Sequence, residues 1–223
     1  MDDQLAWITA LLDDAGIGYW VDSGTLLGLV RDGVLLEHDR DIDISIWDTD
    51  RGKLLSLLDC FGSSGYKVRM YIYSDLCFKV KLRPSVSTWR TIDIDIFSIS
   101  NGHAWSPLPV PRSALEISSL LSGLRANWWA LCRNVPILFH VLCRWMANRT
   151  ARLVMDSYPW NRVFHVCTWW IPLELLDGRS ADSHLHVWIP GNVDGYLCYR
   201  YGDWRTPVTD WDFRRDDGAV KRM

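Results

Sequence analysis

The sequence predicts an α+β fold, in which a mixed β-sheet is flanked by helices and the C-terminal half adds helices and short strands. Two segments predict the sheet, because residues 41–46 and 91–97 alternate polar and apolar side chains with the period of a half-buried strand. Apolar residues at helical spacing in residues 3–15 and 49–60 predict the flanking helices. With 223 residues, 48% of them hydrophobic, the chain is long enough for one large domain, or for a core with a substantial appendage.

A small-residue corner follows the first predicted strand, which is the aromatic and β-branched run at residues 19–22. Ser23, Gly24 and Thr25 form this corner, directly before a short apolar helix that we expect to end at Gly33. Small residues let the backbone approach a ligand closely, and the N–H groups at a helix N-terminus favour phosphate. The corner therefore predicts a phosphate-binding turn.

Aspartates occupy one face of each alternating strand. Asp41 and Asp43 share a face of the first strand, and Asp93 and Asp95 share a face of the second. Neighbouring carboxylates repel and are costly to bury, but a shared divalent cation such as Mg²⁺ or Mn²⁺ resolves both problems. If the two strands are neighbours, a third carboxylate reaches the same site, as two-metal phosphoryl transfer requires. The alternative is a solvated strand face with chance acids, which does not explain the corner upstream or the second acid pair.

A strand pair at residues 66–73 and 76–82 is predicted between the two acidic strands. Its second member carries Lys79, Lys81 and Arg83 at alternating positions, so their side chains share one strand face. Two interpretations stay open: the cations meet phosphates near the acids, or they protect an exposed edge strand.

Residues 100–113 are rich in Gly, Pro and Ser, and they predict a loop between two halves of the chain. We therefore divide the chain into a catalytic core at residues 1–112 and a helical, aromatic region at residues 113–223 that completes the fold and the acceptor site. Residues 114–160 are predicted to be mostly helical, with a break at Pro136. Arginines among tryptophans and leucines there suit either contact with an anionic membrane surface or a helix pair that covers the sheet.

Two short strands are expected in residues 163–190, which are aromatic and β-branched. His184 and His186 share a strand face in this segment, but no third metal ligand is in view. We interpret them as surface or core histidines.

Composition excludes several classes of protein. The net charge of -3 provides no global electrostatic basis for nucleic-acid binding. The six cysteines contain no C-x-x-C pair, which favours a reducing compartment over a zinc site or a disulfide framework. The N-terminal M-D-D-Q-L lacks an apolar signal core, and no uncharged apolar run reaches the ~18 residues of a membrane span. We therefore expect a cytoplasmic protein, with peripheral contact to a membrane as an open alternative.

Four segments, in order along most of the chain, resemble the LicD family, which includes fukutin and fukutin-related protein. Members of that family carry W-L-x-G-G-T-L-L-G-x-x-R-x-G, P-W-D-D-D-I-D, I-D-I-F and Y-L-x-x-x-Y-G-x-D-W. The corresponding segments here are residues 20–33, 39–43, 94–97 and 196–204. The resemblance implies a nucleotidyltransferase (polymerase-β-like) fold.

Three departures from the family pattern fall in the first half of the chain. Ser23 replaces the first glycine of the pair, and Glu37 and His38 stand where Pro-Trp is usual. Arg40 replaces the middle acid of the triple, but the alternation places it on the opposite strand face from Asp41. The acid pair is therefore expected to survive.

By this resemblance, the chain transfers a phospho-alcohol group, such as phosphocholine or ribitol phosphate, from a CDP-activated donor to a glycan hydroxyl. The resemblance also assigns roles to individual residues. The divalent ions would be held by Asp41, Asp43 and Asp95, of which Asp95 would also activate the acceptor hydroxyl. The donor phosphates would be bound by Gly24 and Thr25, with help from Arg31 and with Lys79 and Lys81 nearby.

Two other functions remain open at this point. One is a nucleotidyltransferase that adds a nucleoside monophosphate to a small hydroxyl acceptor, as aminoglycoside-modifying enzymes do, and His38 fits that group better. The other is a non-catalytic glycan-binding module on a transferase fold.

Overall fold

The computed structural model describes residues 2–113, 135–182 and 187–221. Its helices are α1 (Asp3–Asp14), α2 (Ser23–Asp32), the short 3-10 helix η1 (Asp48–Asp50), α3 (Arg51–Ser56), α4 (Leu58–Ser63), α7 (Val135–Arg149), α8 (Trp160–Val163), α9 (Leu173–Leu176), α10 (Val193–Tyr201) and α11 (Phe213–Asp216). Its strands are β1 (Tyr19–Val21), β2 (Asp41–Trp47), β3 (Tyr66–Tyr73), β4 (Leu76–Pro84), β5 (Thr91–Ser100), β6 (His103–Pro111), β7 (Arg152–Val154), β8 (Phe164–Pro172), β9 (Arg179–Asp182), β10 (Val187–Pro190) and β11 (Val220–Lys221).

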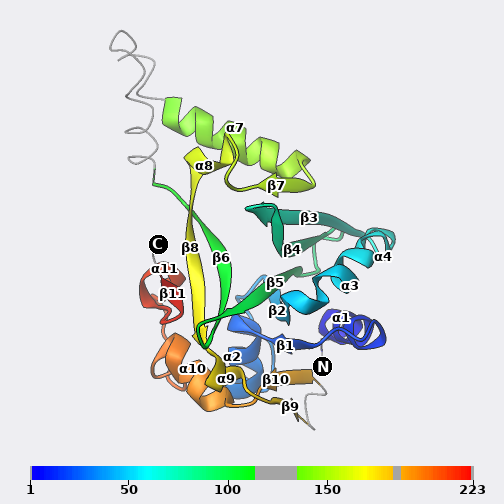
Figure 1. The fold of residues 1–223 in the computed structure, drawn as a ribbon, viewed down its shortest axis with the longest axis vertical. Coiled ribbons are helices and arrows are strands. Elements are labelled where there is room, and N and C mark those ends of the chain that lie inside the picture. Colours follow the sequence, from blue (N-terminus) through cyan, green and yellow to red (C-terminus); the bar gives the residue numbers. More distant parts are fainter. Residues whose placement is uncertain (1, 114–134, 183–186, 222–223) are drawn as a thin grey trace.

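Within the described ranges, nine strands form one mixed sheet that branches at β5. The first part of β5 pairs in parallel with β2 and antiparallel with β4, and its last three residues pair antiparallel with β6. Figure 1 shows β6 and β8 side by side along one side of the molecule, with α1, α3 and α4 grouped on the other. The predicted α+β fold, a mixed sheet flanked by helices, is confirmed.

The core lies on the apolar face of the branching sheet. Val80 and Leu82 of β4 are buried there, as are three isoleucines of β2 (Ile42, Ile44 and Ile46) and three of β5 (Ile92, Ile94 and Ile96). The core helix α1 contributes Leu5, Ile8 and Leu12, as its helical spacing predicts. Because side chains alternate along a strand, burial of the isoleucines places the aspartates of β2 and β5 on the opposite face.

The predicted helix at residues 49–60 is instead divided into η1, α3 and α4. The N–H of Leu57 donates to the carbonyl of Leu54, three residues back instead of four. This tighter bond ends α3, and the chain starts again as α4.

The predicted loop at residues 100–113 is wrong, because most of this segment is strand β6. The strand pairs with β8 along its whole length but with β5 only through its first three residues. The backbone N–H of Arg112 donates to the carbonyl of Val163, which lies just before β8. Because N–H groups alternate between the two sides of a strand, the even-numbered residues of β6 direct theirs toward β8. The prolines lie at 107, 109 and 111, where the missing N–H would face away from β8.

We expect Val110→Pro to destabilise the protein by about 3 kcal/mol or more, because it removes an N–H that bonds toward β8. Pro109→Ala is the matched control, since position 109 makes no such bond, and it should change the free energy of unfolding by less than about 1 kcal/mol. Urea denaturation of both variants measures the difference. Equal losses would contradict the hydrogen-bond pattern assigned to β6.

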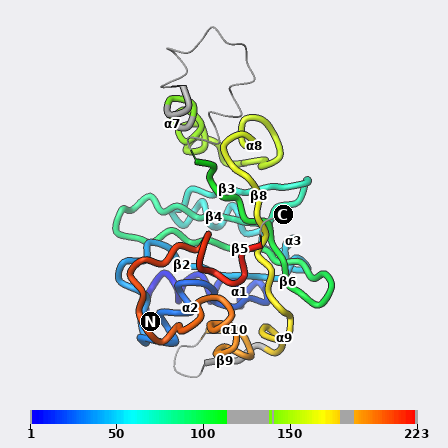
Figure 2. The backbone as a smooth tube through the Cα atoms, turned by 90° about the vertical axis from the view of Figure 1, so that its left-hand side faces the viewer, coloured from blue at the N-terminus to red at the C-terminus, as the bar shows by residue number. Residues whose placement is uncertain are grey.

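The C-terminal half contains a strand within the segment that is predicted to be mostly helical. The described part of residues 114–160 contains α7, and residues 152–154 form strand β7, which pairs in parallel with β3. Figure 2 shows α7 and α8 at one end of the molecule, and α9, α10 and β9 at the other. The strands predicted in residues 163–190 are present as β8 and β10, whereas His184 and His186 lie outside the described residues.

Exposed apolar side chains follow one stripe of α7, at Leu138, Val141, Leu142 and Trp145. Contact between this helix and a membrane surface stays a prediction. No helix in the described ranges has both the length and the apolar composition that crossing a membrane requires.

Candidate active site

Polar side chains of four adjacent strands meet on the face opposite the core. In one row, the register places Asp43 of β2 beside Asp93 of β5, then Lys81 of β4 and Arg69 of β3. The next row contains the following residues in the same strand order: Ser45, Asp95, Lys79 and Tyr71. The face therefore changes from acidic on β2 to cationic on β4 and β3.

Three carboxylates gather at the acidic end of this face. Ligand oxygens of Asp39, Asp41 and Asp43 all lie within 4.8 Å of one another. Strand β2 carries Asp41 and Asp43, and Asp39 lies in the loop just before it. The guanidinium of Arg90 holds this loop by donating to the backbone carbonyls of Leu36 and Asp39.

Two acids of this cluster, Asp39 and Asp43, have raised pKa values. The pKa of Asp39 is raised to about 7, first by burial and then by the adjacent Asp41. Burial also raises the pKa of Asp43 well above its usual range, reinforced by the charges of Asp41 and Asp93. Three close carboxylate oxygens form a hard donor set that suits Mg²⁺ or Mn²⁺, and a bound cation would remove the repulsion.

Lysines bridge the acids of β5. The Lys79 ammonium lies 2.9 Å from Asp93 and 3.1 Å from Asp95, and the Lys81 ammonium lies 2.9 Å from Asp93. Burial alone would raise the pKa of Asp93, but Lys79 and Lys81 lower it. The other oxygen of this carboxylate, Asp93 Oδ1, is buried and has no hydrogen-bond partner among the described residues.

Asp95 lies outside the three-carboxylate cluster. The parallel register pairs Asp43 with Asp93. Asp95 therefore lies beside Ser45, two residues further along the strands. Burial raises the pKa of Asp95, an effect that Lys79 opposes and Asp93 reinforces. A buried carboxylate with a raised pKa is suited to accept a proton near neutral pH.

The small-residue corner packs directly against the cluster. A Cβ at Gly24 would lie 2.2 Å from Asp39 Oδ2, so only glycine leaves room for this carboxylate. The buried hydroxyl of Thr25 accepts the backbone N–H of Asp43 at 2.8 Å, which ties α2 to β2. Binding of donor phosphate by Gly24 and Thr25 stays a prediction.

We expect Gly24→Ala to weaken Mn²⁺ binding about tenfold, because the new methyl group displaces Asp39. Stability should change little, since the atom that must move is the end of a side chain. Gly52→Ala, where a Cβ meets nothing within 4 Å, is the matched control and should bind Mn²⁺ normally. Titration calorimetry with Mn²⁺ compares the two, and equal affinities would remove Asp39 from the ligand set.

Arg31 is not part of this cluster. It lies near the C-terminal end of α2, about 10 Å along the helix from Gly24. Its guanidinium pairs with the neighbouring Asp32 at 2.8 Å.

A buried ion network joins the small-residue corner to the C-terminal helix α10. Arg200 is 2% exposed and contacts Asp22 at 2.7 Å and Asp217 at 2.6 Å. Tyr196 and Ser45 both donate their hydroxyl groups to the Asp22 carboxylate. Asp22 is also the N-cap of α2, so this network fixes the start of the helix beside the acidic cluster.

Sequence reasoning missed Asp39 and the Asp22–Arg200–Asp217 network. Asp39 had a usable signal, because it lies two residues before Asp41 and continues the spacing of the acids. The network had no local signal, since Asp22 and Arg200 are 178 residues apart in the sequence.

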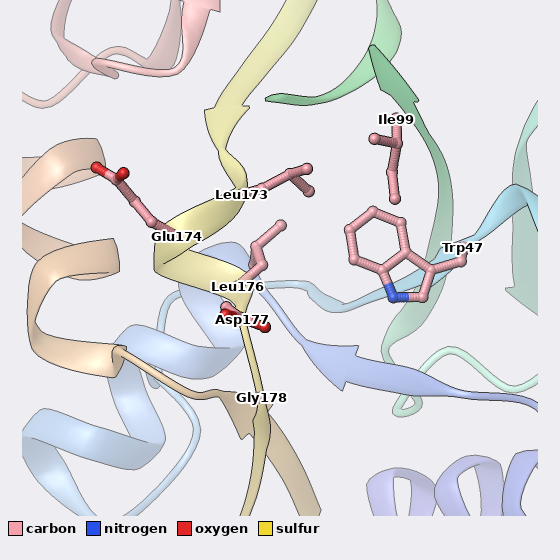
Figure 3. Close-up of a pocket in the computed structure, with 7 residues that line it drawn as sticks. All are labelled: Trp47, Ile99, Leu173, Glu174, Leu176, Asp177 and Gly178. Carbon is pink, nitrogen blue, oxygen red and sulfur yellow. The ribbon is translucent and has the colours of Figure 1, made fainter. Parts of the chain in front are cut away.

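A separate cavity of about 640 Å³ lies at the far end of β2. Figure 3 shows Leu173 and Leu176 pointing toward Trp47 and Ile99, whereas Glu174 points away. Trp47 is six residues beyond Asp41, about 20 Å along the strand. None of the predicted site residues lines this cavity, so we place the candidate chemistry on the acidic face.

One family model matches the segment of the chain that contains the acidic cluster. Residues 16–115 match the family model described as LicD/FKTN/FKRP, nucleotidyltransferase domain. The uncharacterized protein RP689 of Rickettsia prowazekii is 39% identical over 72 residues, which are 32% of this chain and 27% of that protein.

Two transferases are also similar to parts of the chain. Ribitol 5-phosphate transferase FKRP of Homo sapiens is 30% identical over 67 residues, 30% of this chain and 14% of that protein. Ribitol-5-phosphate transferase FKTN of Mus musculus is 23% identical over 201 residues, 90% of this chain and 36% of that protein. The chain thus spans between 14% and 36% of the length of these three relatives.

Among solved structures, ANT(2")-Ia in complex with adenylyl-2"-tobramycin is similar with a TM-score of 0.33 and 18% identity, over 46% of this chain and 55% of that chain.

Proposed function

We propose that the chain is a metal-dependent phosphotransferase, since residues 16–115 match the model of the LicD/FKTN/FKRP nucleotidyltransferase domain. It moves a phospho-alcohol group of the phosphocholine or ribitol phosphate kind from a CDP-activated donor to a glycan hydroxyl. The observation that carries this proposal is the cluster of Asp39, Asp41 and Asp43, inside the matched segment and against the small-residue corner. Two ribitol-phosphate transferases among the relatives support the reaction type.

The three clustered carboxylates would hold Mg²⁺ or Mn²⁺ through their oxygens. A divalent ion bound there would offset the negative charge that develops on the transferring phosphoryl group. Gly24 keeps the N-terminal turn of α2 close to this position, where its N–H groups favour donor phosphate.

Asp95 would take the proton from the acceptor hydroxyl at one of its carboxylate oxygens. Its raised pKa supports that role, and the contact with Lys79 holds the carboxylate on the polar face. The acceptor would therefore approach from the β4 side of the acidic cluster.

The decisive experiment incubates the full chain with a panel of CDP-alcohols and nucleoside triphosphates, plus Mg²⁺ or Mn²⁺ and glycan acceptors. A phosphotransferase releases CMP and leaves a phospho-alcohol on the acceptor. Release of pyrophosphate with a nucleotide on the acceptor would instead identify a nucleotidyltransferase. Consumption of neither donor class would contradict an enzymatic function of this kind.

A further inference from the structure

A cavity of about 490 Å³ opens on the polar face beside the acidic cluster. It is enclosed by β3, β4 and β5 on one side and by β6, α7 and α8 on the other. Figure 1 shows these elements around the upper part of the sheet. The cavity is lined by five cationic side chains: Arg69, Lys79, Lys81, Arg83 and Arg144.

Only part of this positive charge is balanced. Asp93 and Asp95, which also line the cavity, pair with Lys79 and Lys81. Among the described residues, no carboxylate forms an ion pair with Arg69, and none pairs with the other two arginines of the lining. The excess charge therefore comes from the arginines.

Arg69 is the most informative of these cations because it is 6% exposed. Burial and then the positive charge of Arg83 lower the pKa of Arg69, whereas the neighbouring Tyr71 raises it. Arg83 donates to Asn148 of α7 at 2.8 Å, a neutral partner that leaves its charge uncompensated. Keeping a buried cation beside a second cation costs free energy unless an anion joins them.

We propose that this cavity binds a phosphate-type oxyanion carried by the acceptor, at a subsite distinct from the acidic cluster. Guanidinium groups bind phosphate through paired N–H donors, so Arg69 and Arg83 are its main ligands. This inference rests on the proposed function for the identity of the acceptor.

The distance between the acidic end and the cationic end of the polar face indicates that the cavity binds the acceptor and not the donor. Three strand-to-strand steps lie between Asp43 on β2 and Arg69 on β3, which is about 14 Å. Asp95 lies between these ends and also lines the cavity. An acceptor with its anion at Arg69 can therefore present its hydroxyl to Asp95, while the donor phosphates occupy the acidic end.

The test measures binding of inorganic phosphate to the full chain by titration calorimetry, so it does not depend on turnover. We expect Arg69→Met to weaken phosphate binding at least tenfold, and Arg69→Lys to restore part of it. Without phosphate, the Tm of Arg69→Met should equal or exceed that of the parent chain, because an unbalanced buried charge is gone. Arg205→Met is the control, since Arg205 pairs with Asp194 on the exposed surface, and it should bind phosphate normally.

Addition of CMP with Mn²⁺ distinguishes a subsite for the phosphate of the acceptor from a subsite for the phosphates of the donor. Phosphate binding that is unchanged by CMP supports the acceptor subsite, whereas displacement by CMP would overturn it. Normal phosphate binding by Arg69→Met would overturn it as well. Should Arg69→Met not fold, Arg83→Gln gives the same readout at a less buried position. A chain that binds phosphate through Arg69 but consumes no donor would refute the proposed function and retain the anion subsite.

Discussion

Replacing Asp43 with asparagine is expected to lower transferase activity roughly a thousandfold while raising the Tm of the metal-free protein. Activity falls because the cluster loses one of the three carboxylates that would hold the cation. Stability rises because Asp43 has a pKa well above its usual range, owing to burial and then to Asp41 and Asp93. A carboxyl group with a raised folded-state pKa costs stability at neutral pH, since the unfolded chain releases the proton more readily.

The measurements are CMP release with Mn²⁺ present and thermal unfolding with a chelator present. Asp203→Asn is the matched control, because Asp203 is exposed and, among the described residues, its carboxylate accepts only from the Thr206 hydroxyl. It should change neither quantity. A loss of activity accompanied by a Tm several degrees lower would show that Asp43 is structural and would count against the metal site.

Replacing Arg200 with methionine is expected to lower the free energy of unfolding by about 3–5 kcal/mol. The guanidinium is fully surrounded and bonds Asp22 and Asp217, so its removal leaves two buried carboxylates without a counter-ion. It also stacks 4.5 Å from the Trp169 ring, an aromatic contact that methionine only partly replaces. Urea denaturation measures the loss.

Arg214→Met provides the comparison, because the ion pair of Arg214 with Asp212 is half exposed and contributes less than about 1 kcal/mol. The double variant Arg200→Met with Asp217→Asn should recover part of the stability, since one stranded charge is neutralised. Equal stability of the Arg200 and Arg214 single variants would show that the network contributes nothing to folding.

Local sequence patterns correctly predicted the elements whose conformation depends on their own segment alone. Period-two alternation correctly predicted β2 and β5, and it also assigned their aspartates to one face and their isoleucines to the other. Helical spacing predicted α1, and Gly33 ends α2 in the left-handed conformation, with φ of 73°. These features depend on neighbouring residues alone, so the sequence carries them directly.

Local patterns failed where the conformation depends on a partner strand. Residues 103–111 resemble a loop in composition, yet they form a strand that pairs with β8. This is possible because the positions that lack an N–H, the prolines, are those that do not bond to β8. The atoms of β8 that hold this segment as a strand lie outside any sequence window around it. By contrast, the division of the predicted helix at residues 49–60 into α3 and α4 at Leu57 is local, and the apolar spacing did not reveal it.

The sequence by itself determined that acids line one strand face, that lysines line another, and that a small-residue corner precedes them. Only the tertiary structure decided which charges meet. The parallel register places Asp93 beside Asp43 and leaves Asp95 one step away, and the fold brings Arg200 to Asp22 from 178 residues along the chain. Alternation specifies a face because each side chain follows from its own backbone, whereas register and long-range contacts follow from how the whole chain packs.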